Sequence, residues 1–131
     1  MTYPFHAVVY LDHSSAKAFA FDSTKAIEHK IDAATASGTL HHKAGTVGSG
    51  HDQDRKSYWM DIAKVLEPSR EILVVGHGTA KTEFAHFVRD HVPLLMPRIV
   101  GVETLDKATD GEIVAFARKF FEHKDRMTPQ R

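Results

Sequence analysis

Apolar positions in the first quarter of the chain follow the periods of β-strands. Residues 6–12 form a nearly continuous apolar run, which favours a buried strand. Residues 16–22 and 25–32 alternate between apolar and polar side chains, as expected for strands with one covered face. Short polar turns separate the three runs, so we predict a three-stranded meander. In the third strand, Ile27, His29 and Ile31 share the apolar face, which makes His29 a predicted core histidine.

Beyond residue 52 the apolar positions repeat with the period of a helix, and Pro68 ends that segment. The positions that carry this period are Trp59, Ile62, Ala63 and Leu66. The apolar run 71–76 predicts a central strand covered on both faces. A second helical pattern around Phe84 follows it, and residues 97–103 read as a last strand.

A capping box predicts the start of the final helix. Thr109 is the expected N-cap, and Glu112 stands three residues on, where it can bond back to the cap. The predicted element order is therefore β-β-β-α-β-α-β-α. This order predicts a single α/β domain over residues 1–123 with a ribonuclease H-like mixed sheet, followed by a flexible polar tail over 124–131.

Composition removes several classes of function. The chain has 131 residues and no cysteine, which excludes disulfides and thiolate metal sites. Lys plus Arg equals Asp plus Glu at 17 each, so no global field attracts nucleic acid and any RNA contact must be local. We find no signal peptide and no run long enough to span a membrane, and we expect a cytoplasmic protein with no membrane partner.

Two short motifs, placed in this element order, resemble a known family. An Asp closes the first strand, an Ala-Lys pair opens the second, and a glycine turn precedes a Lys and an aromatic-rich helix. These positions are Asp12, Ala16, Lys17, Gly76, His77, Gly78, Lys81 and Phe84. The chain resembles the central domain of the archaeo-eukaryotic peptide release factor and Pelota family, over residues 6–121. The resemblance implies a stand-alone bacterial version of that domain, a role in translation, and the ribosome or RNA as partner.

The polar loop before the first helix departs from the family pattern. Release factors carry Gly-Gly-Gln in this loop, whereas here Gly45, Gly48 and Gly50 are never adjacent and Gln53 follows His51 and Asp52. We therefore expect a ribosome- or RNA-associated domain that does not catalyse peptide release. We also expect no cofactor.

The candidate RNA- or phosphate-binding residues come from two segments. In the turn before the second helix, backbone N–H groups at a positive helix end could hold a phosphate; the alternative is a tight turn that merely needs glycine dihedrals. That turn contributes Gly76, His77, Gly78 and Lys81. The polar loop and the start of the first helix contribute His41, His42, Lys43, His51 and Arg55.

Three alternatives remain at this point. The loop histidines suit a metal, but His41 and His42 are adjacent and in an extended chain point apart, so we predict no metal site. The second alternative is a small metal-dependent nuclease or hydrolase that uses the loop histidines or Asp12. A nuclease would need further carboxylates such as Asp61, yet Glu71 precedes its strand and no third ligand is evident. Asp12 is better explained as a turn residue. The third alternative is a homo-oligomeric scaffold without an RNA partner.

Overall fold

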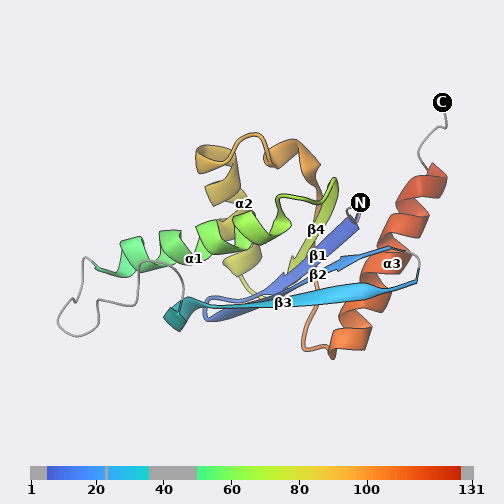
Figure 1. The fold of residues 1–131 in the computed structure, drawn as a ribbon, viewed down its shortest axis with the longest axis horizontal. Helices are drawn as coiled ribbons and strands as arrows, with labels where there is room; N and C mark the ends of the chain where they lie inside the picture. The colour runs from blue at the N-terminus through green and yellow to red at the C-terminus, as the bar shows by residue number, and fades with distance from the viewer. Residues whose placement is uncertain (1–5, 23, 36–49, 128–131) are drawn as a thin grey trace.

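The computed structural model describes residues 6–22, 24–35 and 50–127, and within them the chain forms a five-stranded mixed sheet with three α-helices (Figure 1). The strands are β1 (His6–Leu11), β2 (Ser15–Phe21), β3 (Ala26–Asp32), β4 (Glu71–Gly76) and β5 (Ile99–Thr104). The helices are α1 (Gly50–Leu66), α2 (Ala80–His91) and α3 (Asp110–Met127), with short 3₁₀ turns η1 (Ala33–Thr35) and η2 (Met96–Arg98).

The strand order is β3-β2-β1-β4-β5. β1 pairs antiparallel with β2 and parallel with β4, β2 pairs antiparallel with β3, and β4 pairs parallel with β5. The meander and the two later parallel strands confirm the predicted element order and the ribonuclease H-like fold class.

Two apolar layers lie on opposite faces of the sheet. Val9 and Leu11 of β1 pack with residues of α1 and α2, whereas Val8 packs with residues of α3. Figure 1 shows the same division, with α1 and α2 on one side of the sheet and α3 on the other. β4 contributes to both layers, and Leu73 and Val74 are fully buried, which confirms the predicted central strand.

The prediction for β3 is wrong in one respect. His29 is exposed rather than a core residue, and Ile27 is 53% exposed. Of that apolar face only Ile31 is buried, where it joins the layer beneath α1. An alternating pattern shows which residues share a face, but it does not show how far a helix on another segment extends over that face.

The helix boundaries also differ from the expected ones. α1 begins at Gly50, so His51 and Asp52 belong to the helix rather than to the loop. α3 continues to Met127, four residues into the segment predicted as a tail. Its Lys124 side chain lies 3.4 Å from Glu71, which ties this last turn to the start of β4.

Candidate functional site

The ends of β1 and β4 form one edge of the sheet. The two strands are parallel and in register from His6 opposite Glu71 to Tyr10 opposite Val75, so the residues that follow them meet. Asp12 and His13 follow β1, while His77 follows β4. The parallel register brings the residues after both strands to the same edge, and the charge of His77 is the smallest of the influences that lower the pKa of Asp12. The predicted glycine turn therefore lies beside the motif residue Asp12.

Backbone geometry accounts for both glycines of this turn. A Cβ atom on Gly76 would lie 2.5 Å from the carbonyl oxygen of Leu11, a contact that real side chains do not make. Gly78 has φ +80°, in the left-handed region that favours glycine. The turn thus requires glycine at both positions, whether or not it binds a ligand.

The first turn of α2 follows directly. Thr79 is the N-cap, and its hydroxyl donates to Glu83 Oε2 at 3.0 Å instead of accepting from a backbone amide. The Lys81 ammonium donates to the carbonyl of Gly78 at 2.7 Å. Lys81 therefore closes its own turn in this structure, and binding an anion would require its ammonium to leave that carbonyl or to share it.

Asp12 has the turn role that the sequence predicts. Its Oδ1 accepts hydrogen bonds from the amides of Ser14 (2.8 Å) and Ser15 (2.9 Å) and from the Ser14 hydroxyl. Partial burial opposes ionisation of Asp12, but the bonds from Ser15 and Ser14 outweigh it, so the pKa of this carboxyl lies below its usual value. The Tyr58 hydroxyl donates to the Asp12 carbonyl at 2.8 Å, and burial, with the nearby charge of Asp12, raises the pKa of that phenol.

Glu83 is the centre of a second group of contacts at this edge. Its carboxylate lies 3.1 Å from His13 Nε2 and 3.7 Å from Arg55, and it accepts the bond from Thr79. Partial burial works against the charged form, yet the bonds from His13 and Thr79 and the charges of His13 and Arg55 hold the pKa of Glu83 below its usual value.

Sequence reasoning missed His13, Thr79 and Glu83. His13 and Glu83 are 70 residues apart, and only the parallel pairing of β1 with β4 brings them together. If β1 and β4 are assumed to pair in parallel, the residues that follow the two strands are expected to meet, and this expectation points to His13, Thr79 and Glu83.

Of the predicted site residues, the structure gathers Gly76, His77, Gly78, Lys81 and Arg55 at this edge of the sheet, through the contacts given above. His41, His42 and Lys43 lie outside the described residues. His51 lies in the first turn of α1, and its side chain is outside the described part of the structure.

The carboxylates considered for a nuclease do not converge. Asp12 follows the end of β1, whereas Glu71 begins β4, and five residues of parallel strand separate these edges by about 16 Å. Glu71 instead lies 3.3 Å from His6 Nε2. Among the side chains that the structure describes, in residues 6–22, 24–34 and 55–124, no group of three or more His, Asp or Glu is placed to hold a metal ion.

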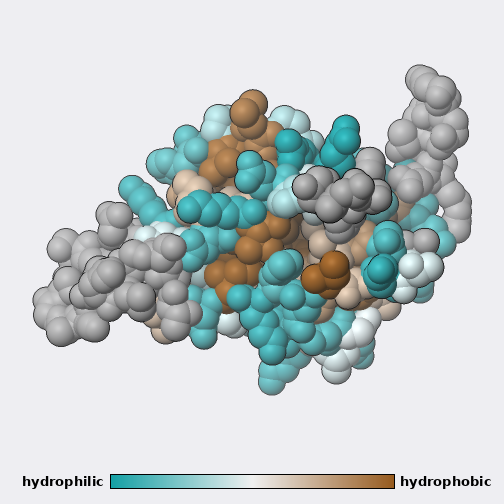
Figure 2. Space-filling view, viewed as in Figure 1, coloured by the Kyte–Doolittle hydropathy of each residue, from teal (hydrophilic) through white to brown (hydrophobic). Residues whose placement is uncertain are grey.

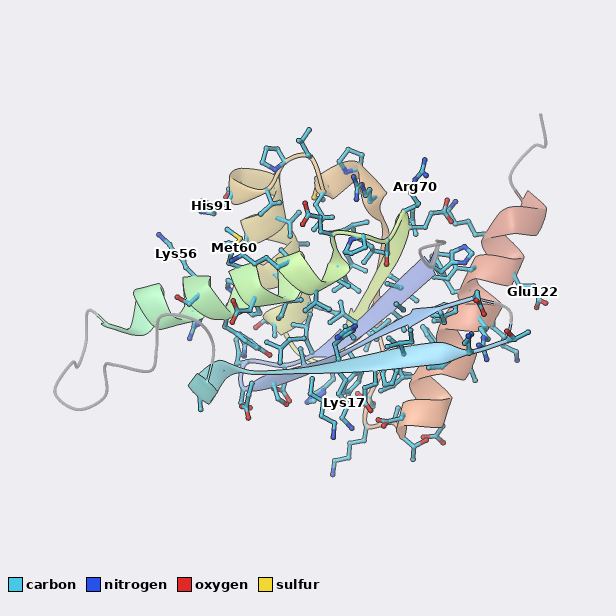
Figure 3. All side chains as sticks on the ribbon, in the orientation of Figure 1. Lys17, Lys56, Met60, Arg70, His91 and Glu122 are labelled. Carbon is cyan, nitrogen blue, oxygen red and sulfur yellow. The ribbon has the colours of Figure 1, made fainter. Side chains whose placement is uncertain are left out.

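A hollow of about 300 Å³ lies elsewhere, between the end of α1 and the connection from α2 to β5. Met60 lines it from α1 (Figure 3), and Leu95 and Arg98 line it from the connection. Leu94 of this connection is 86% exposed. Apolar surface is visible at the top of Figure 2, where Figure 1 draws this connection. None of the predicted site residues in the described part of the chain, Gly76, His77, Gly78, Lys81 and Arg55, lines the hollow.

Comparison with solved structures identifies the fold. The chain is similar to Archaeoglobus fulgidus Pelota (15% identity, TM-score 0.60) and to the Thermoplasma acidophilum Pelota protein (17%, 0.61). It is also similar to an archaeal translation termination factor, aRF1 (12%, 0.55). This is the fold of the Pelota and aRF1 central domain.

The similarity covers 90%, 86% and 92% of this chain, but only 32%, 31% and 41% of the three larger proteins. The chain therefore spans about a third of the length of the two Pelota proteins. No family model matches the sequence, and no curated protein is similar enough to match. Across the described residues, no helix combines the length and apolar character needed to cross a bilayer.

Proposed function

We propose that this chain is a translation-related domain that associates with the ribosome or with RNA. The observation that carries the proposal is the likeness, over about nine tenths of the chain, to Pelota proteins and to a translation termination factor. Such a role would be performed in the cytoplasm.

The proposed role is contact without catalysis of peptide release. The sequence contains no Gly-Gly-Gln, and its loop glycines Gly45, Gly48 and Gly50 are separated from one another. Release of peptide from loaded ribosomes by the purified chain would overturn this part of the proposal.

The proposed contact surface is the edge where β1 and β4 end. Arg55, His77 and Lys81 lie there beside the positive end of α2, which favours anions. His41, His42, Lys43 and His51 extend the surface in the proposal, on the basis of their place in the sequence. Asp12 and Glu83 add negative charge, which opposes a phosphate backbone, so in this proposal RNA is held by a few directed contacts and not by net charge.

Co-sedimentation with ribosomes over a series of salt concentrations tests the proposal. Lys81→Ala should weaken binding and reduce the slope of log affinity against log salt by about 1, because one phosphate contact is lost. Lys119→Ala is the matched control, since it removes an exposed lysine from α3 on the other side of the sheet.

The outcomes separate the alternatives. If the two variants bind equally and show equal slopes of log affinity against log salt, the glycine turn has only a structural role. Absence of co-sedimentation by the unmodified chain at low salt would reject the ribosome as partner altogether.

A further inference from the structure

β3 is an edge strand with an open side. It pairs with β2 alone, and in the described part of the chain no element covers its outer edge (Figure 1). Every β3 residue except Ile31 is exposed, and Ile27 is among the few large apolar side chains that reach solvent. Apolar surface is visible between α1 and β3 in Figure 2. An open edge of this kind is a template for another strand.

Two backbone hydrogen bonds at the ends of β3 show which of its backbone groups point outward. Ala33 N–H donates to Ser14 at 2.9 Å, and Asp22 N–H donates to the Lys25 carbonyl at 3.0 Å. In an antiparallel pair, hydrogen-bonded positions alternate with non-hydrogen-bonded ones. The odd-numbered residues of this segment therefore bond to β2. Three even-numbered residues, Ala26, Glu28 and Lys30, present their backbone N–H and C=O groups at the open edge.

We propose that β3 binds β3 of a second copy of this chain, antiparallel, with the twofold axis passing His29. In this register Glu28 lies opposite Lys30 of the second copy, and Lys30 opposite Glu28 of the second copy. These are outward-facing positions, so each forms a hydrogen-bonded pair. Ile27 lies opposite Ile31 of the second copy on the α1 side of the sheet. The pairing joins two five-stranded sheets into one and covers the exposed Ile27.

Of the twofold registers that pair most of the strand, only this one matches charges. The register passing Ile31 also sets Lys30 opposite Asp32, but it pairs only residues 30–32 instead of all of β3. Residues that face the open edge must lie opposite residues that also face it. The two neighbouring twofold registers therefore have their axis at Glu28 or at Lys30. The axis at Glu28 places Glu28 opposite Glu28 of the second copy. The axis at Lys30 places Lys30 opposite itself and Glu28 opposite Asp32. Like charges directly opposite destabilise a strand pair, and opposite charges stabilise it. The segment "IEHKI" is complementary to its own antiparallel copy, which favours a second copy over an unrelated strand.

This inference is independent of the proposed ribosome contact, because β3 and the edge holding Lys81 are different surfaces. His29→Cys tests it, since the chain has no cysteine of its own. On the axis, His29 forms a non-hydrogen-bonded pair with Cα atoms about 4.5 Å apart, within the range that disulfides span. The variant should form a disulfide-linked dimer under mild oxidation at low protein concentration.

Two matched variants set the baseline. In Lys30→Cys, the cysteines of the two copies lie diagonally across the paired strands. Their Cα atoms are about 7–8 Å apart, too far for a disulfide in this register. Val102→Cys places a thiol on β5, the opposite edge of the sheet, at an exposed residue. Faster crosslinking of His29→Cys than of both controls supports the proposal. Equal rates, or a faster Lys30→Cys, would overturn it.

Charge exchange gives a second readout that needs no thiol. Glu28→Lys and Lys30→Glu each convert two attractive pairs into repulsive ones and should weaken dimerisation by about tenfold or more in sedimentation equilibrium. The double exchange should restore it. If the unmodified chain is monomeric at every concentration examined, or the double variant dimerises no better than the single ones, the paired edge is ruled out.

Discussion

At Asp12, one carboxylate oxygen accepts three hydrogen bonds from the turn that joins β1 to β2. The sequence predicts this role because a short polar turn follows an apolar run, and Asp bonds to the amides two and three residues on. The contacts of Glu83 have no such local signal. They join α1, α2 and the β1–β2 turn, and they exist only because the strands pair as they do.

Replacement of Asp12 by Ala should lower the free energy of unfolding near neutral pH by about 1–2 kcal/mol, because the bonds to a charged acceptor are lost. The folded-state pKa of Asp12 lies below its unfolded value. Its contribution is therefore complete above the unfolded pKa and is lost as pH falls through the folded pKa. The difference between variant and parent, measured by urea unfolding, should shrink below about pH 4.

Asp22→Ala is the matched control. Asp22 accepts the same pattern of bonds from Thr24 and Lys25 in the β2–β3 turn, but it is exposed. It should cost less than Asp12→Ala because the Asp22 carboxylate is exposed, so water replaces the lost bonds more readily. The main-chain anchors are comparable, since the Asp22 carbonyl accepts a bond from Arg118 as the Asp12 carbonyl does from Tyr58. A larger loss from Asp22→Ala would contradict the importance assigned to Asp12.

The turn between β4 and α2 is an element whose two glycines serve different purposes. Gly76 lets two strands approach, while Gly78 supplies a positive φ. Sequence reasoning identifies the turn from its glycines but cannot separate these purposes, because the close approach involves Leu11, far away in the chain.

Alanine substitution separates them. At Gly78, alanine meets no nearby atom and should destabilise by about 1–3 kcal/mol through backbone strain alone. At Gly76, alanine would clash with backbone and should destabilise more, by pushing β4 away from β1. Thermal and urea unfolding of both variants measure the order. Equal losses, or a smaller loss at Gly76, would show that the strand pair yields more readily than this geometry implies.

Among whole elements, periodicity locates every strand and helix, yet it fails for the exposure of β3. The pattern of β3 resembles that of a half-covered strand, and its partner helix covers only the end near Ile31. How much of a strand a helix covers depends on how the layers assemble, so it cannot be predicted from the apolar pattern of that strand alone.

Over the whole molecule, the two apolar layers are unequal. The layer between the sheet and α1 and α2 holds more of the buried residues than the layer beneath α3. Trp59 lies in the larger layer, 4% exposed, and its ring packs against Phe84 and Tyr58. Phe116 in the smaller layer is only partly buried, although its place in the helical apolar period of residues 113–121 predicts a buried side chain.

Trp59→Ala should therefore cost about 3–5 kcal/mol, a large share of the stability of a domain this size. Phe116→Ala, the comparison variant, should cost clearly less because less of its surface leaves water on folding. Urea unfolding monitored by circular dichroism measures both, since Trp59 is the single tryptophan and its fluorescence is lost in the first variant. The reverse order would mean that the α3 layer carries more of the stability.

The parallel pairing of β1 with β4 also constrains how the chain folds. His6 lies opposite Glu71, so this contact closes a loop of some 65 residues, whereas the turns of the meander close within a few. Loop closure on this scale costs about 4 kcal/mol of chain entropy before any contact repays it. The meander can form first from local contacts, and β4 adds to it only when α1 brings its apolar face to the sheet. We therefore expect the proposed contact surface, which needs β1 and β4 side by side, to be completed late in folding.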